Sequence, residues 1–216
     1  ASVNVVPPVA GRLKSGQGVP CIRVSWKWTV GRAGGFRRPG HSWNNASLWP
    51  VFKFVMLSWD IFCTVIDNYG DIGVTWRLAR QLAHERQEPV RLWVDDLASF
   101  ARICPQLRLD QARQQCQGVD IAHWDAHFST SWQPGDLVIE AFACELPELA
   151  KQRMAQCQPA PLWLNLEYLS AESWIDECHG LPSLQLNGLQ KYFYFPGFTQ
   201  RSGGVICEHS LTDQRR

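Results

Sequence analysis

The sequence predicts an α/β protein built on a doubly wound parallel sheet. Segments rich in β-branched and aromatic residues alternate along the chain with segments whose apolar residues recur at helical spacing. The clearest pair is a buried-strand pattern over residues 57–66 and, after a turn, a helical pattern over residues 72–87. At 216 residues the chain is long enough for one domain of good size. Strands that alternate with helices favour a parallel sheet with helices on its faces.

The remaining elements continue this alternation after residue 88. Five more strands are predicted, at residues 89–94, 119–124, 136–142, 161–166 and 190–195. Three more helices are predicted, at residues 97–103, 145–157 and 171–178. Domain boundaries are therefore expected near residues 56 and 200, with residues 201–216 beginning a further region.

The turn between the first strand and its helix carries two carboxylates and two glycines, Asp67, Gly70, Asp71 and Gly73. Ligands of open α/β sheets bind at the carboxyl ends of the strands, so we expect both carboxylates to face one crevice. Asp67 would end the strand, and Asp71 would lie at or next to the helix N-cap. Spacing alone supports two explanations of Asp67 and Asp71 equally. They are either a catalytic pair, or a turn residue and a helix cap.

A third carboxylate, Glu167, leaves the predicted strand 161–166 at the same edge of the sheet. It would either project into the crevice or cap the helix near Ala171, and the sequence supports both explanations equally.

A dinucleotide site is the alternative explanation of the glycines. Only Gly70-x-x-Gly73 matches the second half of the Gly-x-Gly-x-x-Gly pattern, and Asp95 follows Gly73 at the distance expected for a ribose-binding carboxylate. Asp71 would direct a negative charge toward the phosphates, so this alternative is disfavoured.

Charge divides the chain into two parts. Residues 1–55 carry eight Lys or Arg and no Asp or Glu, whereas residues 56–216 carry 13 basic and 20 acidic side chains, a net charge of −7. The basic segment contains four Trp, which would suit a nucleic-acid arm, but it lacks any sustained period, and Met56 directly precedes the first strand. We therefore expect residues 1–55 to be a poorly ordered extension and expect no nucleic-acid partner.

The sequence argues against a membrane-spanning protein and against a zinc-binding protein. No segment approaches the roughly 18 uncharged apolar residues that a membrane-spanning helix needs. The eight cysteines include no Cys-x-x-Cys pair, and Cys178-His179 and Cys207-Glu208-His209 have no second half at zinc-ligand spacing. We expect reduced thiols, no metal site and a cytoplasmic protein.

Several long strings of the sequence strongly resemble one family, the protein-arginine rhamnosyltransferases (EarP family) that modify bacterial translation elongation factor P. The strings lie at residues 58–63, 65–82, 90–97, 138–144, 163–172, 179–183 and 195–199. Together they cover about residues 57–208. Residues 1–55 have no counterpart in the family.

The resemblance implies a Rossmann-like sheet that forms the N-terminal, acceptor-side half of a two-domain GT-B glycosyltransferase. It implies an inverting transfer of L-rhamnose from dTDP-β-L-rhamnose to an arginine of elongation factor P, without cofactor or metal. The family's two motif aspartates match Asp67 and Asp71, with Asp71 in the position of the general base. The implied substrate-binding residues are Asn68, Tyr69, Gly70, Gly73, Glu167 and Tyr168.

The family also has a second domain, which holds most of the nucleotide-sugar contacts and is not seen in this sequence. The expected function of this chain is therefore that of the acceptor-side half, and we expect the chain to be inactive by itself. Its expected partners are the basic acceptor domain of elongation factor P and the sugar donor. The alternatives are a non-catalytic module that binds the factor and, with less support, a nucleotide-dependent oxidoreductase.

Overall fold

An eight-stranded sheet forms the centre of the structure, a computed structural model that describes residues 56–67, 69–125 and 128–208. The strands are β1 (Trp59–Cys63), β2 (Val90–Val94), β3 (Arg113–Cys116), β4 (Val119–His123), β5 (Leu137–Ala141), β6 (Leu162–Leu166), β7 (Pro182–Leu184) and β8 (Gln190–Tyr194). The helices are α1 (Gly70–Glu85), α2 (Leu97–Ala101), α3 (Glu148–Gln156) and α4 (Ile175–Cys178). The predicted extension 1–55 lies outside the described residues.

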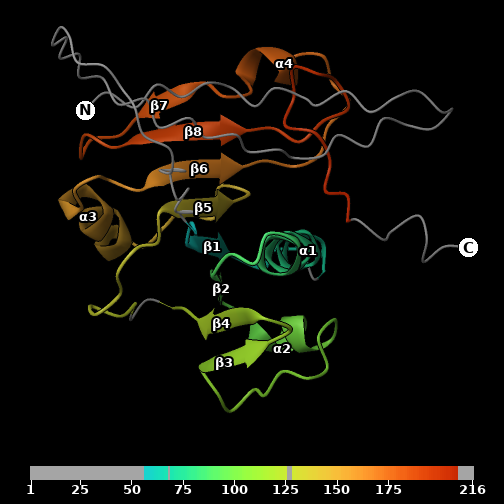
Figure 1. The fold of residues 1–216 in the computed structure, drawn as a ribbon, viewed down its shortest axis with the longest axis vertical. Coiled ribbons are helices and arrows are strands. Elements are labelled where there is room, and N and C mark those ends of the chain that lie inside the picture. Colours follow the sequence, from blue (N-terminus) through green and yellow to red (C-terminus); the bar gives the residue numbers. More distant parts are fainter. Residues whose placement is uncertain (1–55, 68, 126–127, 209–216) are drawn as a thin grey trace, which may run out of the picture.

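The strands follow the order β3-β4-β2-β1-β5-β6-β8-β7 (Figure 1). The six inner strands, β4, β2, β1, β5, β6 and β8, are parallel to one another. At the two edges, β3 pairs antiparallel with β4, and β7 pairs antiparallel with β8. The predicted α/β fold with a mostly parallel sheet is confirmed, including all six predicted strands. β3 and β7 were not predicted.

Alternate residues of the central strands point into two separate cores. β1 and β5 are buried along their whole length, as expected of parallel strands covered on both faces. Ile61 and Ile139 pack with Trp76 of α1 in one core. Phe62 and Val138 pack in the other core, which also contains residues of α3. Helices α1 and α3 therefore cover opposite faces of the sheet.

The direction of the chain reverses between β1 and β5. From β1 the chain builds outward through β2 to β4, and then returns to place β5 on the other side of β1 before continuing to β6 and β8. This is a topological switch point, where loops diverge above the carboxyl ends of the strands and leave a crevice. The loops that follow β1 and β5 therefore lie on either side of this switch point.

Several predicted element boundaries differ from the observed ones by a few residues. Helix α1 begins at Gly70 rather than Ile72, and α4 spans only Ile175–Cys178 of the predicted helix 171–178. That residues 201–216 begin a further region stays a prediction; the last described residues of this segment contact α1. Gln81 donates to the carbonyl oxygen of Cys207 at 2.8 Å, and Arg77 forms an ion pair with Glu208 at 2.8 Å.

Six cysteines in the described part of the chain are free thiols: Cys63, Cys104, Cys116, Cys144, Cys157 and Cys178. Burial raises the pKa of Cys63 to about 12, so that this thiol stays neutral. Cys207 is disulfide-bonded, so the expectation of reduced thiols throughout is wrong at that position. None of the described helices is long and apolar enough to span a bilayer.

The amino end of β1 is fixed by Asp60, a fully buried carboxylate that the sequence analysis did not single out. Arg91 on β2 binds both of its oxygens, at 2.6 and 3.0 Å. The indole N–H groups of Trp93 and Trp132 donate to Oδ1 at 2.8 and 3.4 Å, and the backbone N–H of Gly135 donates to Oδ2 at 2.7 Å. One charge therefore joins β1, β2 and the segment before β5.

We predict that Asp60→Ala lowers the free energy of unfolding of the chain by about 3–5 kcal/mol, because it leaves the Arg91 guanidinium and buried N–H groups without their acceptor. Asp110→Ala is the matched control, since the Asp110 ion pair with Arg108 is exposed, and it should cost less than about 1 kcal/mol. Urea unfolding followed by circular dichroism gives both values. Equal stability losses would show that Asp60 has no special structural role.

Candidate functional site at the carboxyl edge of the sheet

Two carboxylates hold the loop after β1 by three consecutive backbone N–H groups. The N–H of Val65 donates to Oδ1 of Asp95 at 2.9 Å. The N–H groups of Ile66 and Asp67 both donate to Oδ2 of Asp71 at 3.1 Å. Because charge-assisted bonds of this kind are among the stronger hydrogen bonds in proteins, the loop is held in one conformation before any ligand arrives.

Asp71 lies in the first turn of α1 and does not cap the helix. Tyr69 is the N-cap residue, and no side-chain hydrogen bond caps this end. The cap explanation of Asp71 is therefore wrong, because its carboxylate bonds to the preceding loop instead. The side chain is buried, and the hydroxyl of Tyr168 donates to Oδ1 at 2.7 Å.

Tyr168 follows β6, so its bond to Asp71 joins the loops above β1 and β6. The bond to Asp71, reinforced by desolvation, raises the pKa of Tyr168 to about 12. The phenol therefore remains a hydrogen-bond donor at any physiological pH.

Asp67 lies in a different environment from Asp71, although the two are four residues apart. Its side chain is exposed and makes no hydrogen bond or ion pair with any other described residue. The backbone N–H of Gly70 donates to the carbonyl oxygen of Asp67 at 2.8 Å and closes the turn. A Cβ at position 70 would stand 3.0 Å from Oδ2 of Asp67, so glycine leaves room for this carboxylate.

The other predicted substrate-binding residues of the turn are less constrained. Tyr69 is half-exposed, and its hydroxyl accepts from Arg102 at 3.3 Å. A Cβ at Gly73 would meet no atom within 4 Å, so space does not require glycine there. Asn68 lies outside the described residues. Roles in substrate binding remain predictions for all three.

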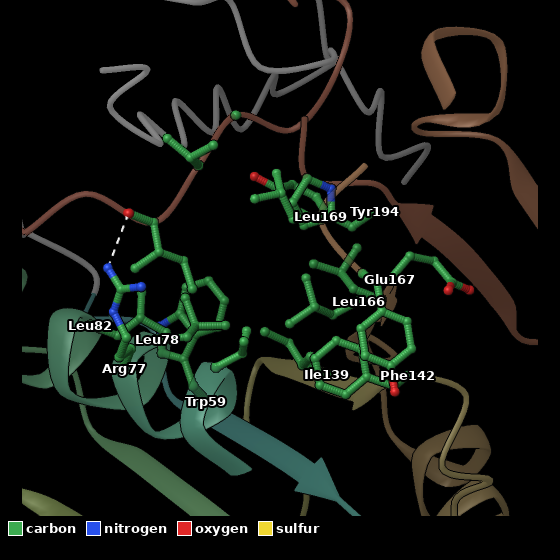
Figure 2. A pocket seen from close by; sticks show the side chains of 17 residues that line it. Trp59, Arg77, Leu78, Leu82, Ile139, Phe142, Leu166, Glu167, Leu169 and Tyr194 are labelled. Carbon is green, nitrogen blue, oxygen red and sulfur yellow. Dashed lines mark hydrogen bonds between the residues drawn. The ribbon is translucent and has the colours of Figure 1, made fainter. Parts of the chain in front are cut away.

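Glu167 is not joined to the two aspartates. Its Oε1 accepts a short hydrogen bond from the Asn165 side-chain amide, and Figure 2 shows the carboxylate directed away from the neighbouring apolar pocket. It does not cap the next helix, because α4 begins eight residues later at Ile175. The cap explanation of Glu167 is therefore wrong, and its role as a third site carboxylate remains a prediction.

The loop after β5 contributes Phe142, which the sequence analysis did not identify as a site residue. Phe142 and Ala143 have positive φ angles of 54° and 52°, a conformation that bulky side chains rarely adopt. The Phe142 ring stacks on the Tyr168 ring, with centroids 4.2 Å apart and planes 14° from parallel. No sequence signal predicts a positive φ at a residue other than glycine, asparagine or aspartate, so the pair could be found only in the structure.

An apolar pocket of about 160 Å³ lies beside this site, between α1 and the strands β5, β6 and β8 (Figure 2). Phe142 and Tyr168 line one part of it, whereas neither Asp67 nor Asp71 lines it. The two carboxylates therefore lie outside this pocket. Within the described ranges, no three His, Cys, Asp or Glu side chains are grouped to hold a metal ion.

The fold and site define a class of α/β domain in which a doubly wound sheet presents carboxylates at its switch point. Residues 59–216 match the family described as Elongation-Factor P (EF-P) rhamnosyltransferase EarP, and the chain belongs to that family. The resemblance noted in the sequence is thereby confirmed.

Curated relatives carry the name protein-arginine rhamnosyltransferase. A Pseudomonas aeruginosa relative is 59% identical over 166 residues, covering 74% of this chain and 43% of the relative. A Shewanella oneidensis relative is 57% identical over 162 residues, covering 73% of this chain and 41% of the relative. A Neisseria meningitidis relative is 46% identical over 156 residues, covering 72% and 40%. The chain thus spans about two fifths of the length of these relatives.

We predict that Asp71→Asn lowers the pKa of Tyr168 from about 12 toward the usual value near 10. The substitution removes the negative charge that disfavours the phenolate. Titration of ¹³Cζ-labelled tyrosine by NMR measures the change, and Tyr194, whose pKa is raised by burial, is the internal reference. Circular dichroism at each pH verifies the fold. An unchanged Tyr168 titration would contradict the Tyr168–Asp71 hydrogen bond.

Proposed function

We propose that this chain is the acceptor-side half of an inverting glycosyltransferase that transfers L-rhamnose from dTDP-β-L-rhamnose to an arginine side chain of elongation factor P. One observation carries the proposal: an exposed carboxylate, Asp67, adjoins a buried, fully oriented carboxylate, Asp71, at the switch point of the sheet. Membership of the EarP family supports the reaction and the factor.

Arginine is a difficult acceptor, and this difficulty explains the need for two carboxylates. A guanidinium has a pKa above about 12, and its lone pairs are delocalised, so it is a poor nucleophile. Carboxylates can bind its N–H groups in a fixed plane and localise its charge on one side. One nitrogen is then freer to attack the anomeric carbon of the sugar.

The two aspartates suit different parts of this task. Asp67 is exposed and has no partner among the described residues, so it is the carboxylate that an incoming guanidinium can reach first. Asp71 is oriented by the loop and by Tyr168, which suits a group that must accept a proton at a defined position. As the C–N bond forms and the bond from the anomeric carbon to dTDP breaks, dTDP leaves with the electron pair. Asp71 takes the nitrogen's proton.

The surface around the aspartates suits a protein acceptor. Exposed apolar side chains follow the carboxyl ends of several strands: Ile66, Tyr69, Tyr168, Leu169, Trp174 and Phe198. Residues 56–216 also carry the net charge of −7, which would attract a basic partner and orient its approach. These features support elongation factor P as partner, and they support equally the second candidate, a module that binds the factor without turnover.

The oxidoreductase alternative has little support from the site. The ribose-binding role proposed for Asp95 competes with its hydrogen bond to the Val65 N–H. The space beside Gly70 faces the Asp67 carboxylate rather than being open to a pyrophosphate.

We predict that Asp71→Asn in a full-length family member lowers rhamnosyl transfer by about 10²- to 10⁴-fold, because an amide cannot accept the proton. Binding of the factor should change little, since the amide oxygen can still accept the two backbone N–H groups. Mass spectrometry of the factor measures transfer. The control is Asp→Asn at the position of the family member that matches Asp110, an exposed residue of this chain. Near-normal turnover would remove Asp71 from the mechanism.

We also predict that the 216-residue chain alone binds the basic acceptor domain of elongation factor P weakly and catalyses no transfer. Binding should weaken as salt screens the charges. Transfer requires the donor to be held in line with the nucleophile, and such positioning can contribute roughly 7–11 kcal/mol. Calorimetry with the factor and with dTDP-rhamnose separately, plus a long-incubation assay, tests this. Measurable transfer would show that the chain holds the donor by itself.

A further inference from the structure

Both oxygens of Asp71 are engaged in the described structure. Oδ2 accepts the two backbone N–H groups of the loop, and Oδ1 accepts the Tyr168 hydroxyl. Backbone bonds to Oδ2 fix one end of the carboxylate but leave its plane free to rotate, since rotation about the terminal bond of an aspartate has broad minima. The hydroxyl of Tyr168 is the contact that selects one plane.

The position of Tyr168 depends in turn on the loop after β5. Tyr168 is 54% exposed, so the surrounding core does not enclose it. Its ring lies flat on Phe142 instead. The backbone of Phe142 is held in its positive-φ conformation from two sides, because its own N–H donates to the Leu166 carbonyl at 2.7 Å and the Ala143 N–H donates to the Asn165 side chain at 3.2 Å.

An unusual backbone conformation that the surrounding structure enforces is a common feature of functional sites. Here the conformation brings an aromatic ring against Tyr168, whose hydroxyl bonds to the carboxylate of the proposed base. Asn165 and Leu166 belong to β6, the strand that precedes Tyr168, so the same segment fixes both rings. A relay of contacts therefore runs from the end of β6 through Phe142 and Tyr168 to Asp71.

We propose that Tyr168 is a positioning residue for Asp71 and that Phe142 fixes Tyr168 in that role. The proposal rests on the proposed function of Asp71 as proton acceptor. Oδ1 has a second acceptor direction beside the Tyr168 bond, and the proton of the attacking nitrogen would be received there. Tyr168 itself neither gains nor loses a proton, in keeping with a pKa raised well above neutrality.

The test uses a full-length family member with substitutions at the residues matching Tyr168 and Phe142. Tyr168→Phe keeps the stacked ring and removes only the hydroxyl, so it should lower kcat about tenfold or more, because small losses of orientation are costly in catalysis. KM for the factor and for the donor should be unchanged, and so should the melting temperature. Phe142→Leu removes the stacking ring and should also lower kcat. Phe142→Tyr keeps a stacking ring, so its kcat should stay close to that of the unchanged enzyme. Tyr192→Phe is the matched control, because the Tyr192 hydroxyl bonds to Gln190 away from the site.

Each other outcome overturns the proposal. A rise in KM for the factor with kcat unchanged would make Tyr168 a direct contact for the acceptor. A parallel loss of kcat and melting temperature in Tyr168→Phe would make its role structural. Unchanged kinetics in Tyr168→Phe, with Asp71→Asn inactive, would remove the positioning role and leave the proposed function intact. Activity in Asp71→Asn would remove both.

Discussion

The site depends on the capture of three successive backbone N–H groups by two side chains. Without Asp95 and Asp71, the N–H groups of Val65, Ile66 and Asp67 would have to find other acceptors. With those bonds, the loop above β1 has a defined path, and the exposed Asp67 side chain is presented from a fixed backbone. A rigid loop of this kind lowers the conformational entropy lost when a substrate binds. The path of the loop that carries Asp67 is therefore a property of the free protein.

The two ends of β1 are organised by the same physical means for different purposes. At the amino end, the buried Asp60 is saturated by a guanidinium, two indole N–H groups and a backbone N–H, and none of its bonding capacity is open to solvent. At the carboxyl end, Asp71 is nearly as buried but lies beside a carboxylate that remains exposed. The buried ion pair that joins the strands therefore lies near one end of β1, and the two aspartates of the candidate site follow its other end. Substitutions at one end are expected to leave the properties of the other end largely intact.

Most of the strands predicted correctly have a pattern set by burial on both faces, whereas β4 alternates and β8 is only partly buried. The central strands are continuous apolar runs. The turn after β1 is marked by its carboxylates and glycines, so the sequence indicated Asp67 and Asp71 as candidate residues, and their roles stay predictions. β3 and β7 could not be found from the sequence, because Arg113–Cys116 is mostly polar and β7 is a three-residue edge strand beginning at Pro182. Phe142 was missed for a different reason: its importance lies in a backbone conformation and a contact with Tyr168, and both are set by tertiary structure.

The two antiparallel edges have a consequence for how this domain can meet other polypeptides. β3 is a four-residue strand on a tight hairpin, and β7 is three residues long and contains a proline. Short edge strands and proline discourage the addition of another strand, so the sheet is terminated at both sides. A partner, or any further domain, must therefore contact the faces of the sheet or the loops above it. Growth of the sheet by strand addition, which leads to fibrous assembly, is disfavoured at the same two places.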